Sequence, residues 1–370
     1  MLLQILKEVE DTRGKKGRQY ENWAVLFMAI VAIICGANSY RSIHTYIDQR
    51  LQYFKKKLDI GWKKAPSYTS IRSIICSTES MHLEKAFRKH AGMLNSEYDY
   101  KSKLNISSDG KTIKGSYDGK SDEGAIHFLN IFAQQTQIIL GHKIVGDKTN
   151  EIPVFQEMLK ELDIEDAVYT ADAMHNQKKT IDEIKNTNND LIVRVKSNQP
   201  TLLEDCVYTA KECQKSCLSY SSDVEKNRNR IEERSIKIFN DFKMTNEGWE
   251  HIAQLAEISR SVERYNTKDG TWSPSHETCY FASTAIFTAK DFLDFSRKHW
   301  GIENSNHYVR DVTFQEDKSR IRKNPFNMAI LRSFALNILR HNAAKSIQNE
   351  RYRCSINNDA VRKYKGIWDF

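Results

Sequence analysis

Three acidic residues occupy positions from which folding could bring their carboxylates together. Asp109 and Asp172 each end a short apolar stretch typical of a β-strand, and Glu303 lies in a segment typical of a long helix. Carboxylate oxygens suit Mg²⁺ or Mn²⁺, and two such ions can stabilise the attacking and leaving oxygens of a phosphodiester displacement. The pattern therefore predicts a metal site for phosphoryl transfer. Spacing alone does not establish it, because the usual role of an Asp-Gly pair such as 109–110 is a turn.

The elements that would position these acids begin near residue 100. Runs rich in β-branched and aromatic residues predict strands at 105–109, 127–133, 138–144, 167–171 and 191–196, with helices at 152–162 and 177–185. This order describes an antiparallel meander that continues into right-handed parallel crossovers, as in a ribonuclease-H-like mixed α/β sheet flanked by helices. Ligands of open α/β sheets collect at the carboxyl ends of strands, where Asp109 and Asp172 fall.

Domain boundaries follow from changes in this pattern. Residues 1–95 predict an all-helical N-terminal domain, and 100–345 a catalytic domain interrupted by a β-rich insertion at about 202–285. Residues 346–370 are interpreted as a basic tail. The longest apolar run, 23–35, is shorter than the roughly 20 residues that span a bilayer, so it predicts a buried core helix and a protein without a membrane anchor.

The composition is typical of a folded protein, and its positive charge is compatible with a nucleic-acid partner. The 370 residues include 56 Lys and Arg against 48 Asp and Glu, a net charge of +8, but mildly basic surfaces are common. The 7 cysteines have no recurring pair spacing, so we interpret them as reduced and the protein as cytoplasmic.

A possible DNA-reading element lies in the N-terminal region. The sequence Ala65-Pro66-Ser67 separates two predicted helices, and lysines flank the break. One interpretation is a helix-turn-helix. The other is a helical bundle with a solvated lysine cluster, because charge runs usually mark exposed faces.

Five short sequence motifs, which we call words, surround the three acids in a fixed order. They span residues 109–116, 148–153, 171–177, 196–201 and 299–304 together with 311–317. Together these words closely resemble the DDE transposases of bacterial insertion sequences, specifically the H-repeat-associated group. The resemblance extends from about residue 5 to 340. At Ser296 and His299 the chain departs from the Tyr and Arg that broader relatives often carry, while Arg310 keeps the positive charge of their Lys.

The resemblance implies roles for the acids. Asp109, Asp172 and Glu303 would be the catalytic residues and would hold two Mg²⁺ or Mn²⁺ ions in a ribonuclease-H-like core. The implied partners are double-stranded DNA of the element's terminal repeats and the target, bound with help from the N-terminal domain. Because two ends must be paired, we expect a homodimer in the DNA complex, which would associate with the bacterial nucleoid.

Five further residues are predicted to contact DNA phosphates. Lys111, Lys114 and Lys148 each flank a sequence word, and His299 and Arg310 flank Glu303 on the predicted helix. The alternative for the lysines is simple exposure on the surface.

Other groups near the third acid have competing interpretations. His299, Glu303 and His307 follow one another at i+4 spacing and could bind zinc, although a histidine that orients a carboxylate is the favoured interpretation. Glu316 or Asp317 could replace Glu303 as the third ligand, or form ordinary salt bridges. Trp300 could pack in the core or form a platform for base stacking, and core packing is the favoured interpretation.

Two alternatives to a transposase remain at this stage. One is a catalytically inactive DNA-binding repressor derived from a transposase. The other is a metal-dependent nuclease that cuts DNA without strand transfer.

Overall fold

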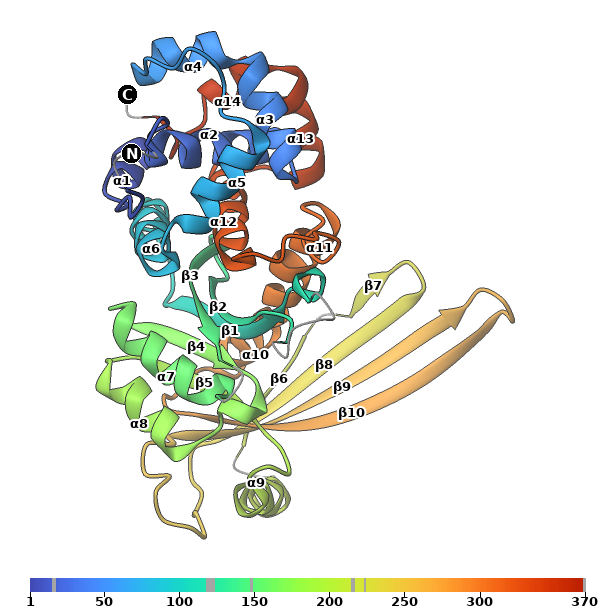
Figure 1. Ribbon diagram of the computed structural model, residues 1–370. Helices are drawn as coiled ribbons and strands as arrows, with labels where there is room; N and C mark the ends of the chain where they lie inside the picture. The colour runs from blue at the N-terminus through green and yellow to red at the C-terminus, as the bar shows by residue number, and fades with distance from the viewer. Residues whose placement is uncertain (15–17, 118–123, 147–148, 214–216, 223, 369–370) are drawn as a thin grey trace. The chain divides into compact units, whose positions relative to one another are not determined.

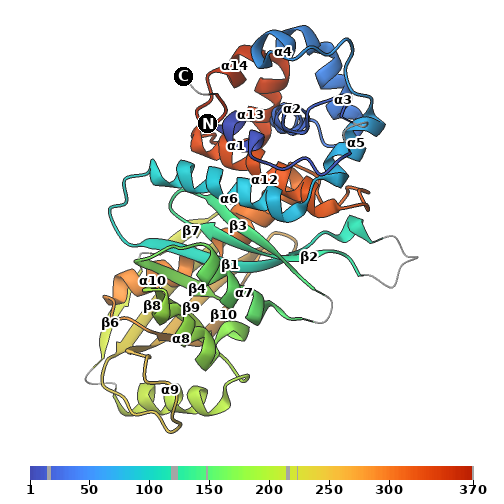
Figure 2. The same ribbon diagram turned by 60° about the vertical axis from the view of Figure 1, so that its left-hand side comes forward.

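The computed structural model describes residues 1–14, 18–117, 124–146, 149–213, 217–222 and 224–368. The chain divides into two units (Figures 1 and 2). We call Met1–Lys101, Gly110–Asn150 and Gly301–Phe370 the helical unit, and Ser102–Asp109 with Glu151–Trp300 the sheet unit.

The helical unit contains most of the helices and one β-hairpin. Its helices are α1 (Leu2–Lys7), α2 (Asn22–Ile34), α3 (Tyr40–Gln49), α4 (Leu51–Leu58), α5 (Tyr68–Ser77), α6 (Ser80–Ser96), α11 (Tyr308–Val312), α12 (Pro325–His341), α13 (Ile347–Ile356) and α14 (Asn358–Arg362). A short 3-10 helix, η2, covers Lys114–Ser116, and a π-helix, η4, covers Ile302–His307. The hairpin consists of β2 (His127–Ala133) and β3 (Ile138–Val145), which pair antiparallel.

Helix α2 forms the core of the helical unit. Every residue of α2 except Trp23 is buried, and α1, α3 and α12 pack against it. This confirms that the apolar run is a core helix. Among the described residues, no helix combines the length and apolar character needed to span a bilayer.

Two serines cap the helices that they precede. The side chain of Ser39 accepts a hydrogen bond from the backbone N–H of Ser42 at the start of α3, and Ser67 accepts one from Ser70 at the start of α5. Helix α5, the second half of the predicted helix–break–helix, packs against α2, α3 and α12. It is therefore part of a helical bundle, whichever surface it presents to a partner.

The C-terminal residues fold onto the helical unit. Arg351 and Cys354 of α13 are buried, as is Ile367. The Arg351 guanidinium donates to the carbonyl of Ile33 at 3.0 Å, at the end of α2. The segment interpreted from its charge as a basic tail therefore contributes packed helices.

The sheet unit is built on parallel strands with helical crossovers. Its helices are α7 (Glu151–Glu161), α8 (Lys178–Asn186), α9 (Pro200–Glu212) and α10 (Ala289–Lys298), and a 3-10 turn, η3, covers Ala173–His175. Its strands are β4 (Ala167–Ala171), β5 (Asp190–Val195), β6 (Leu218–Ser221), β7 (Glu225–Asn227), β8 (Arg230–Phe239), β9 (Gln254–Asn266) and β10 (Thr271–Ser283). Strand β1 (Leu104–Thr112) starts in the sheet unit and ends in the helical unit.

The strands follow the order β3-β2-β1-β4-β5-β10-β9-β8-β6, with β7 beside β8. Strands β1, β4 and β5 are parallel, and β10 is antiparallel to β5. The chain thus has a large mixed sheet flanked by helices, as the sequence predicts at the level of α/β class.

The strands of the predicted insertion continue the main sheet. Ser283 of β10 pairs with Ile192 of β5, and β8, β9 and β10 run on as long strands (Figure 1). The inserted segment also begins with helix α9. The boundaries given above for the domains remain a prediction.

Helices cover the two faces of the parallel strands. Val168 of β4 belongs to a core cluster with Phe292 and Phe295 of α10, whereas the neighbouring Tyr169 packs on Phe155 of α7 with ring centroids 6.0 Å apart. Because successive side chains of a strand point to opposite faces, α10 and α7 lie on opposite faces of β4.

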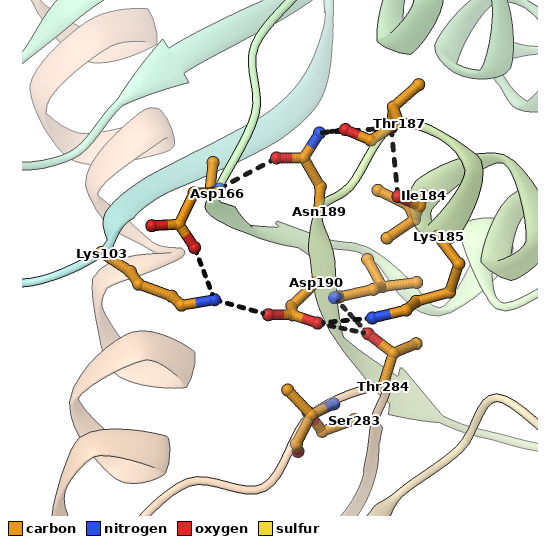
Figure 3. Close-up of polar contacts among 12 residues, drawn as sticks. Lys103, Asp166, Ile184, Lys185, Thr187, Asn189, Asp190, Ser283 and Thr284 are labelled. Atoms are coloured by element: carbon orange, nitrogen blue, oxygen red, sulfur yellow. Dashed lines mark hydrogen bonds and ion pairs between the residues drawn. The ribbon is translucent and has the colours of Figure 1, made fainter.

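A polar cluster ties the starts of the parallel strands together (Figure 3). Asp190 of β5 accepts hydrogen bonds from Lys103, just before β1, and from Lys185 of α8, each at 3.0 Å. Lys103 also pairs with Asp166, just before β4, at 2.8 Å. Burial raises the pKa of Asp190, but the hydrogen bonds from both lysines outweigh burial and hold this pKa below its ordinary value. The cluster lies at the end of the strands opposite to Asp109 and Asp172.

Candidate active site

The register of β1 and β4 brings Asp109 and Asp172 side by side. The two strands are parallel, and their last paired residues are Ser108 and Ala171. Each aspartate directly follows its member of this pair, and neighbouring strands lie about 4.8 Å apart. The sequence predicts that β1 ends at Asp109, whereas the strand continues to Thr112. Asp109 instead marks the point where β1 stops pairing with β4.

Both carboxylates share the face of the sheet that α10 covers. Ser107 and Thr170, two residues before the aspartates, lie with their hydroxyl oxygens 2.8 Å apart, and side chains two apart on a strand share a face. On this face Asn105 donates a hydrogen bond to the carbonyl of Phe295 in α10 at 3.4 Å. The helix that covers the face is therefore fixed to the strand that carries Asp109.

His299, at the end of α10, bridges two residues of the second aspartate's strand. Its Nδ1 lies 3.2 Å from the Thr170 hydroxyl, and its Nε2 lies 3.6 Å from Oδ1 of Asp172. The His299 side chain is 19% exposed and that of Asp172 is 65% exposed. The interaction with His299 is the main reason why the pKa of Asp172 lies below its ordinary value. His299 thus orients a carboxylate, as the sequence suggests, but the carboxylate is Asp172.

The loop after Asp172 is held by two other sequence words. Asn198 donates to the carbonyl of Ala173 and Gln199 donates to that of Asn176, both at 2.8 Å. Nε2 of the buried His175 lies 3.7 Å from the carboxylate of Glu151. The words 148–153, 171–177 and 196–201 therefore meet around the loop that carries Asp172.

Glu303 belongs to the helical unit, in the π-helix Ile302–His307, where its side chain is exposed. His307, in the same π-helix, lies 3.3 Å from the Asn130 amide nitrogen. Within the described ranges, no group of three or more His, Cys, Asp or Glu side chains is arranged to hold a metal. The zinc alternative at His299, Glu303 and His307 therefore has no support in the geometry, and the predicted trio Asp109, Asp172 and Glu303 is not among such groups either.

Lys111 forms ion pairs within the protein. Its side chain is 5% exposed, and its ammonium lies 2.6 Å from Asp311 and 3.8 Å from Asp317. Lys114 differs, because its side chain is 80% exposed and its ammonium lies 3.9 Å from Asp317. Of these two predicted phosphate contacts, Lys111 is buried and Lys114 is exposed, and the contact of Lys114 with DNA stays a prediction. Lys148 lies outside the described residues.

Arg310 is a fully buried residue that joins three segments of the helical unit. Its guanidinium donates to both carboxylate oxygens of Glu316, at 2.8 and 3.0 Å, and to Asn130 of β2 at 3.2 Å. Arg332 of α12 lies 3.6 Å from the same carboxylate. Burial raises the pKa of Glu316, but the charges of Arg310 and Arg332 outweigh burial and lower it to about 2.

This arrangement bears on the predicted DNA contact of Arg310 and on the two alternative third ligands, for which it favours ion pairs. Arg310 has no exposed surface with which to contact DNA, and Glu316 is committed to two arginines and is not available as the third metal ligand. Asp317, the other alternative ligand, pairs with Lys111. The prediction of core packing for Trp300 is wrong, since this side chain is 56% exposed at the end of α10.

Thr170 and Ser107 are site residues that the sequence did not single out. Thr170 donates to the carbonyl of Ile106 at 3.2 Å, which leaves its lone pairs to receive Ser107 and His299. The sequence signal that could have identified these two hydroxyl residues was their position two residues before each aspartate, which puts them on the same face of the strand. Hydroxyl residues are common in strands, so this signal is not specific.

Two protein families match the chain. Residues 100–338 match the family described as "Transposase DDE domain", and residues 3–91 match the one described as "DDE_Tnp_1-associated".

Similar curated proteins extend over nearly the whole chain. "Putative transposase YncI" of Escherichia coli O157:H7 is 29% identical over 349 residues, which cover 92% of this chain and 87% of the relative. "H repeat-associated putative transposase YhhI" of Escherichia coli strain K12 is 27% identical over 350 residues, covering 91% and 90%. Among solved structures, a piggyBac transposase synaptic complex with hairpin DNA covers 97% of this chain and 76% of that one. Its TM-score is 0.41 at 11% identity, a likeness too low to bear on the fold.

Proposed function

Because the chain belongs to the DDE transposases, in the group that includes the H-repeat-associated proteins, we propose that it catalyses transposition of an insertion sequence. The reaction would cut the element's DNA at its ends and join it to target DNA. Asp109, Asp172 and Glu303 would be the catalytic carboxylates.

One observation carries this proposal beyond family membership. The parallel register of β1 and β4 sets Asp109 beside Asp172 on one face of the sheet, where ligands of α/β sheets bind. The strand order β3-β2-β1-β4-β5 also supports the inference of a ribonuclease-H-like core. The helical crossovers α7 and α8, which connect β3 to β4 and β4 to β5, fit the same core.

The donor set fits a hard divalent cation. Asp109 and Asp172 offer carboxylate oxygens on neighbouring strands, and Asp172 is ionised over a wide pH range because His299 lowers its pKa. These oxygens suit Mg²⁺ or Mn²⁺. We infer that the two aspartates would share two such ions, with Glu303 as a further ligand. When bound, the ions would supply charge stabilisation for the attacking and leaving oxygens.

The proposed chemistry consists of two in-line displacements at phosphorus. In the first, a water oxygen bonds to phosphorus at an element end, the phosphorus–O3′ bond breaks, and the water's proton leaves with the 3′-oxygen as a hydroxyl. In the second, that 3′-hydroxyl attacks target DNA and displaces a target 3′-oxygen. No covalent enzyme–DNA intermediate is required. His299 would keep Asp172 oriented, and the exposed Lys114 would contact a phosphate.

The proposed partner is double-stranded DNA, namely the terminal repeats and a target site. Helix α5 and the lysines before it lie within residues 3–91, which match the transposase-associated family. This supports a role of the region in binding the ends. We propose a homodimer in the DNA complex, since two ends must be held together.

Oligonucleotides of the candidate ends test the function. The protein is incubated with labelled ends, a target duplex and Mg²⁺, and the products are resolved on denaturing gels. We expect nicked and joined products, both abolished by Asp109→Asn and by Asp172→Asn. The matched control is Asp182→Asn, which changes an aspartate that is 57% exposed in the same unit and pairs with His251.

The same assay separates the alternatives. Nicking without joining would identify a nuclease, and specific binding without any cutting would identify a repressor. Cutting that survives Asp172→Asn would overturn the assignment of the site.

A further inference from the structure

The turn of helix that carries Glu303 is unusually wide. Ile302–His307 is a π-helix, while Gly301 before it and Tyr308 after it have ordinary α-helical dihedral angles. Short π-helical turns inside α-helices are rare and frequently mark functional sites. Widening the turn changes the direction in which Glu303 points relative to a regular helix. The geometry of this turn therefore bears directly on where its carboxylate lies.

The sequence of the turn does not favour helix by itself. Four of its residues, from Asn304 to His307, are Asn, Ser, Asn and His, which are poor helix formers. In a wide turn the backbone carbonyls accept from donors at i+5 in place of those at i+4. Contacts from outside the turn then help to hold this form against a regular helix.

Arg340 of α12 supplies one such contact. One end of its guanidinium donates to the carbonyl of Ser305 within the turn, and the other donates to the carbonyl of Gln137, between β2 and β3, at 2.7 Å. The guanidinium also lies 5.3 Å from the ring centroid of Phe132. Burial lowers the pKa of Arg340 to about 9, so the group is a cation at neutral pH. It links the turn to a helix and a hairpin of the same unit.

A second anchor lies at the end of the turn. Asn130 of β2 is fully buried, and its amide nitrogen lies 3.3 Å from Nε2 of His307. The amide oxygen of Asn130 accepts from Arg310, three residues beyond His307. The turn is therefore held in its middle by Arg340 and at its end by Asn130, while Glu303 stays exposed near its start.

We propose that Arg340 is a positioning residue for catalysis: by holding the Ser305 carbonyl it maintains the wide turn and so sets the place of the Glu303 carboxylate. This inference rests on the proposed function, in which Glu303 is a catalytic carboxylate. It assigns an effect on the rate of DNA cutting to a residue of α12 that is distant in sequence from Glu303.

Three variants separate positioning from stability. Arg340→Met removes both hydrogen bonds to carbonyls but keeps an unbranched side chain, and Arg340→Lys keeps the charge without the planar pair of donors. Arg88→Met is the matched control. Arg88 belongs to the same unit and donates to a backbone carbonyl, that of His142 at 3.0 Å, but it is not among the anchors of the turn.

Hydrogen exchange of the metal-free protein reports on the turn directly. We expect amides of 302–307 to exchange at least about tenfold faster in Arg340→Met, since a lost anchor allows local opening, and partial protection in Arg340→Lys. Arg88→Met should leave their exchange unchanged. Unchanged exchange in Arg340→Met, or an equal increase in Arg88→Met, would overturn the proposal.

Single-turnover cutting tests the catalytic consequence. We expect Arg340→Met to slow cutting by about a hundredfold, the effect of a small misplacement of a reacting group, without weakening DNA binding. The double variant Arg340→Met/Glu303→Gln should be no slower than Glu303→Gln, because both changes act through one carboxylate. Additive losses would overturn the proposal. If the wild-type protein cuts no DNA, the proposed function fails, and the exchange data alone decide whether Arg340 holds the turn.

Discussion

Nε2 of His299 lies 3.6 Å from Oδ1 of Asp172, and the same ring contacts Thr170 through Nδ1. The two contacts fix the ring against the strand that carries the aspartate. A histidine in this place holds the carboxylate from the side, which leaves the rest of Asp172 exposed. Asp172 thus combines an oriented carboxylate with a side chain that is 65% exposed.

His299→Ala should raise the pKa of Asp172 toward its ordinary value. The interaction with His299 is the first cause of the lowered pKa, and a lowered pKa means that the carboxylate stays ionised to lower pH. In the variant, protonation of Asp172 should begin at higher pH. Carboxyl carbon NMR of the metal-free protein measures this titration. His251→Ala is the control, because His251 and Asp182 form a similar pair at 3.7 Å that is largely exposed.

The position of Asp172 beside Asp109 could be predicted from sequence, whereas the partners of His299 could not. Parallel crossovers bring strand ends to one edge, so two acids that each follow an apolar strand are expected to meet. The direction in which His299 points from the end of α10 depends on how this helix packs on the sheet. Residue types alone do not specify that packing. The same holds for Lys111, whose partner Asp311 lies 200 residues further along the chain.

The π-helix shows another limit of sequence patterns. Spacing of four residues implies that His299, Glu303 and His307 share a face only if the helix is regular. The wide turn at Ile302–His307 breaks that rule. Its cause is tertiary, because the anchoring groups come from α12 and β2.

Glu316→Gln should destabilise the protein strongly. It leaves Arg310 and Arg332 buried without a counter-charge, and loss of one partner of a buried ion pair typically costs about 3–5 kcal/mol. Urea unfolding at neutral pH measures the loss. An exposed acid such as Glu79 (outside these contacts) offers the control Glu79→Gln, which should change the free energy of unfolding by less than about 0.5 kcal/mol.

The same carboxylate predicts a pH dependence. The pKa of Glu316 is about 2 in the folded protein and roughly 4.3 in an unfolded chain. Its contribution to stability is therefore complete above the unfolded pKa and is lost as the pH falls toward the folded pKa. The free energy of unfolding of the wild type should fall more steeply between these two values than that of Glu316→Gln. Equal slopes would show that folding does not lower the pKa of Glu316.

Gly115→Ala tests how closely the segment after Asp109 packs on the backbone of Asp317 and Ser319. A Cβ at Gly115 would lie 2.3 Å from the carbonyl oxygen of Ser319 and 2.7 Å from that of Asp317. Backbone atoms cannot swing aside as a side-chain end can, so we expect a loss of about 1–3 kcal/mol in unfolding free energy. Gly92→Ala in α6 is the control. Nothing lies within 4 Å of its Cβ, and alanine should stabilise the helix by up to about 1 kcal/mol.

Loss of charge should weaken DNA binding at Lys114 and lower the stability of the protein at Lys111. Lys114 is 80% exposed, so Lys114→Ala should leave stability unchanged, weaken binding to all DNA sequences alike, and reduce the salt slope of binding by about 1. Lys111 is buried against Asp311, so Lys111→Met should lower the free energy of unfolding, since it leaves that carboxylate without its partner. Fluorescence anisotropy at several salt concentrations and urea unfolding measure the two effects. A salt slope reduced by Lys111→Met at unchanged stability would restore the sequence-based assignment of Lys111 to a DNA phosphate.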